Sequence, residues 1–302
     1  MMKTIKTGVL EIAYLEVGPV DGPPIVLLHG FPYDVHAYDE VARILASAGK
    51  RCLTPYLRGF GQTRFLNEQT MRSGEQAAIG ADLLAFLDAL KIEKALLAGY
   101  DWGGRGACIV AALWPERVSG LISCGGYSIQ NIAQAHKPVS PEAEHLLWYQ
   151  YYLHGSRGRA GLTSNRKAFC HLLWRMWSPT WGFAQEAFDT TAAAFENHDF
   201  VEVVIHSYRH RFGLVEGDPA YRNIAFRLAA QPKIAVPSLV LEGGADAVDP
   251  PARDDPFARY FIGPYRREIL EGVGHNVPQE APERFADGVL NLLRNQGGSI
   301  EG

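Results

Sequence analysis

Short apolar runs alternate with amphipathic stretches along most of the chain. Each run is four to six residues long and is bounded by turn-forming residues, which is typical of a buried strand. The runs stand at residues 25–28, 51–56, 95–100, 121–124, 238–241 and 266–270. Between the runs, apolar residues recur at helical spacing, as in Leu83, Phe86, Leu87 and Leu90 and again in Phe285, Val289 and Leu292. This alternation predicts an α/β fold with a mostly parallel central sheet flanked by helices on both faces.

The alternation stops between residues 127 and 228, where strand-like runs are few. Aromatic residues and helix formers dominate this stretch, and its aromatic residues include Trp148, Tyr149, Tyr151, Tyr152, Trp174, Trp177 and Trp181. The strand pattern resumes at Ser238, which favours an insertion over a simple extension of the helical layers. We therefore predict a core at residues 1–126 and 229–302, with a helical cap at residues 127–228 above the carboxyl edge of the sheet.

Composition limits the partners and the compartment. The chain has 302 residues, 47% of them hydrophobic, and a net charge of -4 without a long basic run, so neither nucleic acid nor an anionic membrane is an expected partner. The first residues lack the pattern of a signal peptide and no apolar stretch reaches membrane-spanning length, so we expect a cytoplasmic protein. Cys52, Cys108, Cys124 and Cys170 have no paired spacing and are expected to be buried free thiols.

Residues 99–103, Gly-Tyr-Asp-Trp-Gly, form the most informative segment. They follow an apolar run and open a predicted helix, which is the nucleophile-elbow pattern with Asp101 where serine usually stands. Small residues are needed on both sides because the turn is tight and its central residue is strained. Taken alone, the pattern could equally be a turn with a helix-capping aspartate. Its position downstream of a second motif favours a nucleophile.

The second motif is His-Gly-Phe-Pro at residues 29–32, which also follows a strand. Its loop can direct the backbone N–H of Phe31 into the site, where it would form an oxyanion hole with the N–H of Trp102. We interpret His29 as a structural histidine that braces loops, because the useful donor is the backbone of Phe31.

Together these motifs resemble the α/β-hydrolase superfamily, and within it the branch of epoxide hydrolases and haloalkane dehalogenases. The resemblance extends over nearly the whole chain. It implies that Asp101 forms an ester with a small-molecule substrate, and that a histidine held by a second acid activates the water that hydrolyses this ester. Neither a metal nor an organic cofactor is expected, since no cluster with metal-ligand spacing is visible.

The remaining triad residues are expected in two late loops. His275 stands in a glycine-flanked loop between the last strand and a helix, which fits the order nucleophile, acid, histidine. Asp246 fits the family spacing for the acid, and Asp249 is the alternative, although it is more typical of a turn before Pro250. Residues 123–127 lack the carboxylate on which fluoroacetate dehalogenases and one class of haloalkane dehalogenases rely.

The bond that is broken depends on which groups receive the leaving atom. Epoxide hydrolases of this branch use two cap tyrosines, and the resemblance implies Tyr152, or Tyr151 if the alignment slips by one, together with Tyr208. The alternative for each tyrosine is a core aromatic residue. A halide needs weak donors such as indole N–H groups, and Trp102 occurs in both classes, but Phe31 cannot donate from its side chain. The cap tryptophans at positions 148, 174, 177 and 181 could substitute.

The predicted function is the hydrolysis of an epoxide to a diol, with a substrate pocket that includes Phe31, Trp102 and Tyr151. The alternatives are a haloalkane or haloacid dehalogenase with the same triad, and a non-catalytic binder of small molecules. Fluoroacetate dehalogenases bind a carboxylate with arginines near the nucleophile, and Arg105 could match one of them. Because Arg105 stands in a first helical turn, we interpret it more simply as a surface or helix-packing residue.

Overall fold

The strands form a single sheet in the computed structural model, which describes residues 2–297. Their bounds are Met2–Lys6 (β1), Leu10–Val17 (β2), Pro24–Leu28 (β3), Arg51–Pro55 (β4), Arg64–Phe65 (β5), Ala95–Tyr100 (β6), Val118–Cys124 (β7), Ser238–Gly243 (β8) and Tyr265–Leu270 (β9). The strand order is β1-β2-β4-β3-β6-β7-β8-β9, and β5 pairs with β2. The strands from β4 to β9 along this order run parallel, which confirms the predicted sheet.

Every one of the six apolar runs forms a strand, whereas β1, β2 and β5 were not predicted. These three strands form the antiparallel edge of the sheet. Strand β1 is largely exposed, and polar residues interrupt both β1 and β2. Such strands lack the continuous apolar run of a parallel strand that is buried on both faces.

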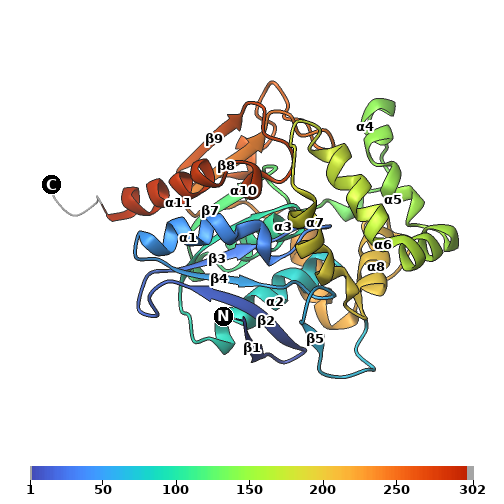
Figure 1. The fold of residues 1–302 in the computed structure, drawn as a ribbon, viewed down its shortest axis with the longest axis horizontal. Helices are drawn as coiled ribbons and strands as arrows, with labels where there is room; N and C mark the ends of the chain where they lie inside the picture. Colours follow the sequence, from blue (N-terminus) through green and yellow to red (C-terminus); the bar gives the residue numbers. More distant parts are fainter. Residues whose placement is uncertain (1, 298–302) are drawn as a thin grey trace.

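The helices divide into a core set and an inserted set. Their bounds are Asp39–Ser47 (α1), Gln76–Ala89 (α2), Asp101–Leu113 (α3), Pro141–Leu146 (α4), Trp148–Tyr152 (α5), Ser156–Trp177 (α6), Gln185–Ala192 (α7), Phe200–His210 (α8), Arg222–Ala229 (α9), Val277–Glu280 (α10) and Pro282–Gly297 (α11). Helix α1 packs on α11, and α2 packs on α3, with the two pairs on opposite faces of the sheet (Figure 1). None of the helices in the described residues is long and apolar enough to cross a membrane.

The stretch between β7 and β8 contains helices α4 to α9. Figure 1 shows α4 to α8 grouped together on one side of the sheet. Helix α9 instead packs against α2 of the core. The cap at residues 127–228 stays a prediction, and α9 places the last residues of this stretch against the core.

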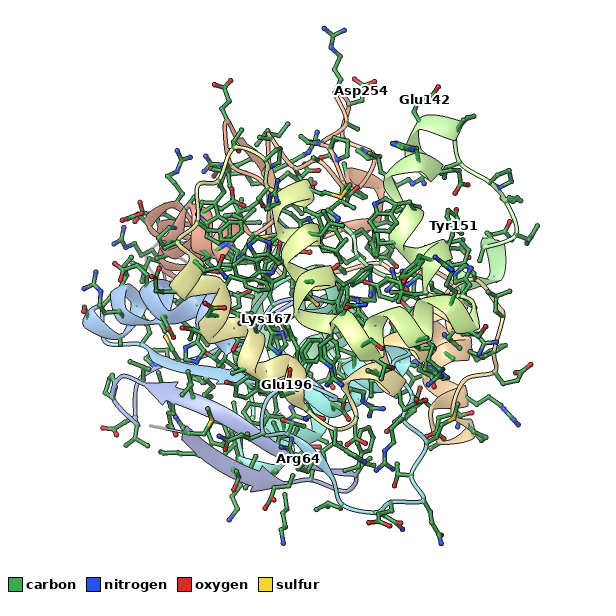
Figure 2. The ribbon with its side chains drawn as sticks, turned by 45° about the vertical axis from the view of Figure 1, so that its right-hand side comes forward. Arg64, Glu142, Tyr151, Lys167, Glu196 and Asp254 are labelled. Atoms are coloured by element: carbon green, nitrogen blue, oxygen red, sulfur yellow. The ribbon has the colours of Figure 1, made fainter. Side chains whose placement is uncertain are left out.

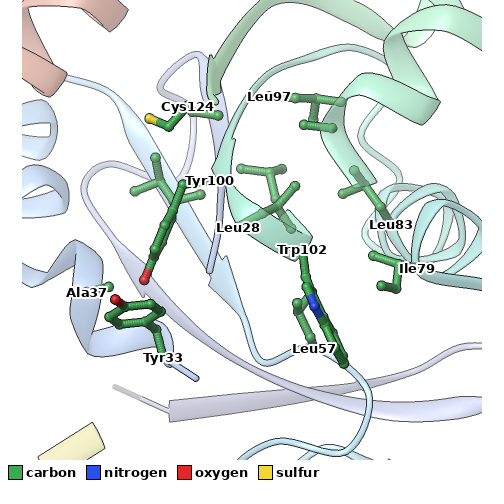
Figure 3. Packing of buried hydrophobic residues seen from close by; sticks show 14 of the residues in the cluster. Leu28, Tyr33, Ala37, Leu57, Ile79, Leu83, Leu97, Tyr100, Trp102 and Cys124 are labelled. Atoms are coloured by element: carbon green, nitrogen blue, oxygen red, sulfur yellow. The ribbon is translucent and has the colours of Figure 1, made fainter. Parts of the chain in front are cut away.

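Two neighbours of Asp101 anchor it in different parts of the core. Tyr100 and Trp102 are almost completely buried, and Figure 3 shows Tyr100 facing Tyr33 while Trp102 lies beside Leu57. The rings of Tyr33 and Tyr100 are 5.2 Å apart. The turn that carries Asp101 is therefore held by large apolar side chains on both sides, which restricts its movement.

Candidate active site

The turn between β6 and α3 holds Asp101 in a strained backbone conformation. Its φ angle is +49°, in the left-handed region that non-glycine residues rarely adopt. The neighbouring glycines leave no room for side chains, since a Cβ at Gly103 would lie 2.0 Å from the carbonyl oxygen of Leu28. A Cβ at Gly30 would lie 2.5 Å from that of Asp101. The small residues thus permit the sharp bend that presents Asp101 to the cavity described below.

A backbone donor holds one oxygen of the Asp101 carboxylate. The N–H of Phe31, in the loop after β3, donates to Oδ1 of Asp101 at 2.7 Å. Trp102 is the second residue of α3, where backbone N–H groups lack helical acceptors and favour negative charge. The two backbone groups predicted for an oxyanion hole therefore belong to segments that meet at Asp101.

His29 braces this loop as a neutral histidine. Its Nδ1 lies 2.9 Å from the carbonyl oxygen of Gly30, and its Nε2 lies 3.0 Å from the backbone N of Leu57. A single tautomer, with the proton on Nδ1, satisfies both contacts. Complete burial lowers the pKa of His29 to about 4, which keeps the ring uncharged at neutral pH.

His275 forms a close pair with Asp246. The Nδ1 atom of His275 lies 2.7 Å from Oδ2 of Asp246. The other oxygen of Asp246 accepts backbone N–H groups from Val248 and Asp249. Burial by itself would raise the pKa of Asp246, but the charge and hydrogen bond of His275 keep it lowered. Of the two predicted acids, Asp246 thus contacts the imidazole, and Asp249 supplies a backbone donor that orients Asp246.

The imidazole of His275 is buried between negative charges. Burial by itself would lower its pKa, but the charge and hydrogen bond of Asp246, with the charges of Asp101 and Asp249, raise it to about 9. Within residues 2–297, no group forms a hydrogen bond with Nε2 of His275. The ring nitrogen that does not contact Asp246 is therefore available to another partner.

A cavity of about 620 Å³ brings the predicted triad together. Its core side is lined by Asp101, Asp246, Asp249 and His275. Its cap side includes Tyr149, Tyr151, Gln150 and Arg211. Because the lining also includes residues at the ends of β6, β7 and β8, the cavity lies at the carboxyl edge of the sheet, where ligands bind in open α/β sheets.

The cap tyrosine that lies beside Tyr208 is Tyr149, and this corrects the expected Tyr152. The rings of Tyr149 and Tyr208 are 5.4 Å apart. Tyr152 stacks on Phe169 of α6 at 5.8 Å, and a Cβ at Gly161 would lie 1.9 Å from its hydroxyl. Helix α5 is a single short turn with four aromatic residues, so packing against α6 and α8, rather than sequence register, decides which ring reaches the cavity.

The other aromatic residues that were predicted for the site differ in burial and in their position relative to the cavity. Tyr151 lines the cavity, but it is 40% exposed, and Figure 2 shows it at the surface of the molecule. Its hydroxyl donates to Glu144. Phe31 and Trp102 are completely buried and stack at 5.6 Å, outside the cavity lining, which corrects their assignment to the pocket surface. Tyr208 is also completely buried, with its ring 5.4 Å from Phe31 and 5.9 Å from Trp102. These three rings pack on one another, and Tyr208 also contacts Tyr149, which lines the cavity.

Arg105 is not the surface residue that its position suggested. It is only 8% exposed, and it lines the cavity with Arg211, which sequence reasoning missed. The available signal for Arg105 was its spacing of four residues after Asp101, which places both on one face of α3. No comparable signal in the sequence marks Arg211. It follows α8, and the folding of the chain brings it to the same cavity as Arg105.

No group of His, Cys, Asp and Glu side chains within the described residues is arranged to hold a metal ion. The four cysteines are free and buried, as predicted.

The chain matches the family described as alpha/beta hydrolase fold over residues 23–282. It therefore belongs to the α/β-hydrolase family and is a hydrolase.

Relatives with nearly the same length carry epoxide hydrolase names. Epoxide hydrolase A from Mycobacterium tuberculosis is 25% identical, over 96% of both chains. A crystal structure from Klebsiella pneumoniae, named as a candidate epoxide hydrolase, is 44% identical with a TM-score of 0.95 and covers 97% of both chains. A haloalkane dehalogenase from Mycolicibacterium paratuberculosis is 34% identical, over 40% of both chains. The chain is thus similar to proteins named epoxide hydrolases along nearly its whole length and to a protein named haloalkane dehalogenase along part of it.

Proposed function

We propose that the protein hydrolyses epoxides to diols through a covalent ester on Asp101. The observation that carries this proposal is one cavity shared by Asp101, the His275–Asp246 pair and a buried tyrosine that lies beside a second. A nucleophile, a base and a donor for the leaving oxygen are the groups that this reaction needs. The full-length similarity to proteins named epoxide hydrolases supports the same reaction.

In the first step, the free oxygen of Asp101 attacks a ring carbon and the C–O bond of the epoxide breaks. Burial raises the pKa of Tyr149 to about 12, against the effect of Arg211, and burial also raises the pKa of Tyr208 well above its usual value. Both hydroxyls are therefore protonated at neutral pH and can donate to the epoxide oxygen. The alkoxide that forms takes a proton from one of the two tyrosine hydroxyls. Protonated His275 then returns a proton to that tyrosine and becomes neutral.

In the second step, neutral His275 takes a proton from water, and the resulting hydroxide adds to the ester carbonyl. Esterification prepares His275 for this role, because it removes the charge of Asp101 that helps to raise the histidine's pKa. The N–H groups of Phe31 and Trp102 would stabilise the tetrahedral oxyanion. Its collapse releases the diol, restores the Asp101 carboxylate and leaves His275 protonated as at the start.

Trapping the ester tests the mechanism. The variant His275→Gln should accumulate the intermediate, so that mass spectrometry after exposure to styrene oxide shows an increase on the peptide that contains Asp101. The double variant Asp101→Asn/His275→Gln is the control and should show no increase. Diol formation by freshly prepared Asp101→Asn at the wild-type rate would contradict the covalent scheme. Tight ligand binding without any turnover would instead favour a non-catalytic binder.

A second candidate function is dehalogenation, and the indole of Trp102 favours it. Its Nε1–H is buried and, in the described part of the chain, has no acceptor, which is the kind of weak donor that a halide uses. By contrast, Nε1 of Trp174 already donates to the carbonyl oxygen of Pro32 at 2.7 Å. Halide release from chlorinated and brominated substrates, measured beside diol formation from styrene oxide, separates the two functions.

A further inference from the structure

Three side chains form a hydrogen-bonded chain that ends at the hydroxyl of Tyr149. Nη1 of Arg211 donates to Oε1 of Gln150 at 3.2 Å, and Nε2 of Gln150 donates to the hydroxyl of Tyr149 at 2.9 Å. Tyr149 and Gln150 are neighbours on α5, whereas Arg211 follows the end of α8. All three residues line the cavity that contains Asp101. The reaction proposed above involves Tyr149 alone, so the buried amide beside it needs a separate explanation.

The chemistry of these groups fixes the direction of both hydrogen bonds. A guanidinium can only donate, so the side-chain oxygen of Gln150 must face Arg211. The NH2 group of Gln150 then faces Tyr149, and because this group also only donates, the tyrosine oxygen must accept. The hydroxyl proton of Tyr149 is therefore not used within the chain and is available to a substrate.

Burial protects this arrangement from exchange with water. Gln150 is 5% exposed and Tyr149 is 4% exposed. Hydrogen bonds in such a buried chain are stronger than in water, and each polarises the next. The far end of the chain is also held in place, since the centre of the Arg211 guanidinium lies 4.3 Å from the ring centroid of Tyr208. The amide of Gln150 thus has one preferred orientation before a substrate binds.

The chain favours the anionic form of Tyr149. Burial raises the pKa of Tyr149 to about 12, and the charge of Arg211 and the hydrogen bond of Gln150 act in the opposite direction. When the hydroxyl loses its proton, the negative charge stays on the oxygen that Nε2 of Gln150 already contacts. A donor that is in place before the charge forms stabilises that charge without a cost of reorganisation.

We propose that Gln150, oriented by Arg211, is a positioning residue for epoxide opening and acts through the hydroxyl of Tyr149. As Asp101 bonds to the ring carbon and the C–O bond breaks, the hydroxyl proton passes to the epoxide oxygen. The electron pair of the O–H bond stays on the tyrosine oxygen, where the N–H of Gln150 stabilises it. This inference rests on the function proposed above, because Tyr149 donates its proton only if an epoxide is opened.

The rate of ester formation tests this role. In the His275→Gln background, mass spectrometry at successive times after addition of styrene oxide follows the first step alone. Gln150→Leu should slow this step roughly tenfold or more, as expected when one hydrogen bond to a charged group is lost. Gln150→Glu keeps the length of the side chain and an acceptor for Arg211 but loses the donor, so it should slow the step at least as much. An unchanged rate in both variants would overturn the proposal.

A double-mutant cycle separates a positioning role from a structural one. When Tyr149→Phe is also present, Gln150→Leu should have almost no further effect, since the hydroxyl on which Gln150 acts is gone. A further slowing of the same size would mean that Gln150 acts on packing or directly on the substrate, and this result would overturn the proposal.

The contribution of Arg211 has its own matched control. Arg211→Met should slow ester formation because the amide of Gln150 loses the partner that orients it. Arg209→Met should not, because Arg209 lines a separate surface depression. Equal rates in these two variants would reject the role of Arg211.

Failure of this inference can be told apart from failure of the proposed function. The absence of any ester on Asp101 in His275→Gln, with Gln150 intact, would reject the covalent reaction and this inference with it. Ester formation that is equally fast with and without the Gln150 amide would reject the inference alone. If Gln150→Leu does not fold, Gln150→Glu makes the same comparison, because Arg211 keeps its acceptor.

Discussion

The side chain of Asp101 must be held in place and must also present a free oxygen to the substrate. Its Oδ1 accepts the backbone N–H of Phe31, so its orientation is set before a substrate arrives. Its positive φ angle and the glycines around it keep the other oxygen directed to the cavity. Such preorganisation lowers the cost of reaching an attack geometry. The same principle applies to Tyr149, whose hydroxyl accepts a hydrogen bond from Nε2 of Gln150 at 2.9 Å and keeps its own proton to donate.

At the scale of single residues, we predict that Tyr149→Phe and Tyr152→Phe differ sharply. Loss of the Tyr149 hydroxyl should lower kcat/KM for epoxide opening by roughly 10²-fold, the lower end of general-acid contributions, because Tyr208 remains. Tyr152→Phe removes a hydroxyl that lies against Gly161, away from the cavity, and should leave kcat/KM nearly unchanged. Diol formation under steady-state conditions measures both. The opposite ranking would restore Tyr152 as the cap donor.

At the scale of elements, the loop that carries His275 is held by both the core and the cap. Glu280 of α10 accepts the backbone N–H groups of Gly274 at 2.7 Å and Asn276 at 3.0 Å. Ser178, just after α6, donates to Glu280 at 2.6 Å and accepts the N–H of His275 at 3.0 Å. The position of the imidazole therefore depends on a hydrogen-bond network that joins α6 and α10, which lie far apart in the sequence.

We predict that Ser178→Ala destabilises the fold more than Thr180→Ala. The first change leaves the buried N–H of His275 without its acceptor and should lower the free energy of unfolding by about 1–3 kcal/mol. The hydroxyl of Thr180 donates to the carbonyl oxygen of Gly272 in the same loop, but this contact is exposed, so its loss should cost less than about 1 kcal/mol. Urea denaturation of the two variants makes the comparison. Equal losses would contradict a larger contribution from the Ser178 contact.

At the scale of the whole molecule, cap and core are joined around the cavity. The indole of Trp174 donates to Pro32, beside the N–H that holds Asp101, and the backbone N–H of Ala247 donates to the carbonyl of Trp177. Thr191 of α7 donates to Asp34 at 2.9 Å. The charges that raise the pKa of His275 come from Asp101, Asp246 and Asp249, which lie on separate segments of the core, so that the protonation of His275 depends on the folded chain.

This assembly predicts a pH dependence of stability. The pKa of His275 is raised from 6.5 to about 9, so its contribution is fully present below pH 6.5 and is lost as the pH rises through 9. Between pH 6.5 and 8, the stability advantage of the wild type over His275→Gln should fall by about 1.5 kcal/mol. Urea denaturation of both proteins at the two pH values measures this difference. An advantage that stays constant or grows with pH would contradict the raised pKa.

The local sequence pattern was sufficient to predict the features that depend on residues close together in the chain. The six parallel strands are apolar runs, and Asp101, Asp246 and His275 each follow one of them, so their meeting at the carboxyl edge followed from the alternation of strands and helices. The edge strands could not be predicted in this way, because their polar face breaks the run.

Packing between segments far apart in the sequence decided which cap tyrosine and which arginines line the cavity. Whether Tyr149 or Tyr152 reaches the cavity depends on how α5 lies against α6 and α8, since both residues belong to one short aromatic helix. Arg105 is buried in the folded chain, and Arg211, which follows α8 more than a hundred residues later, lines the same cavity. Burial and charge environment depend on these long-range contacts, which no periodicity along the sequence records.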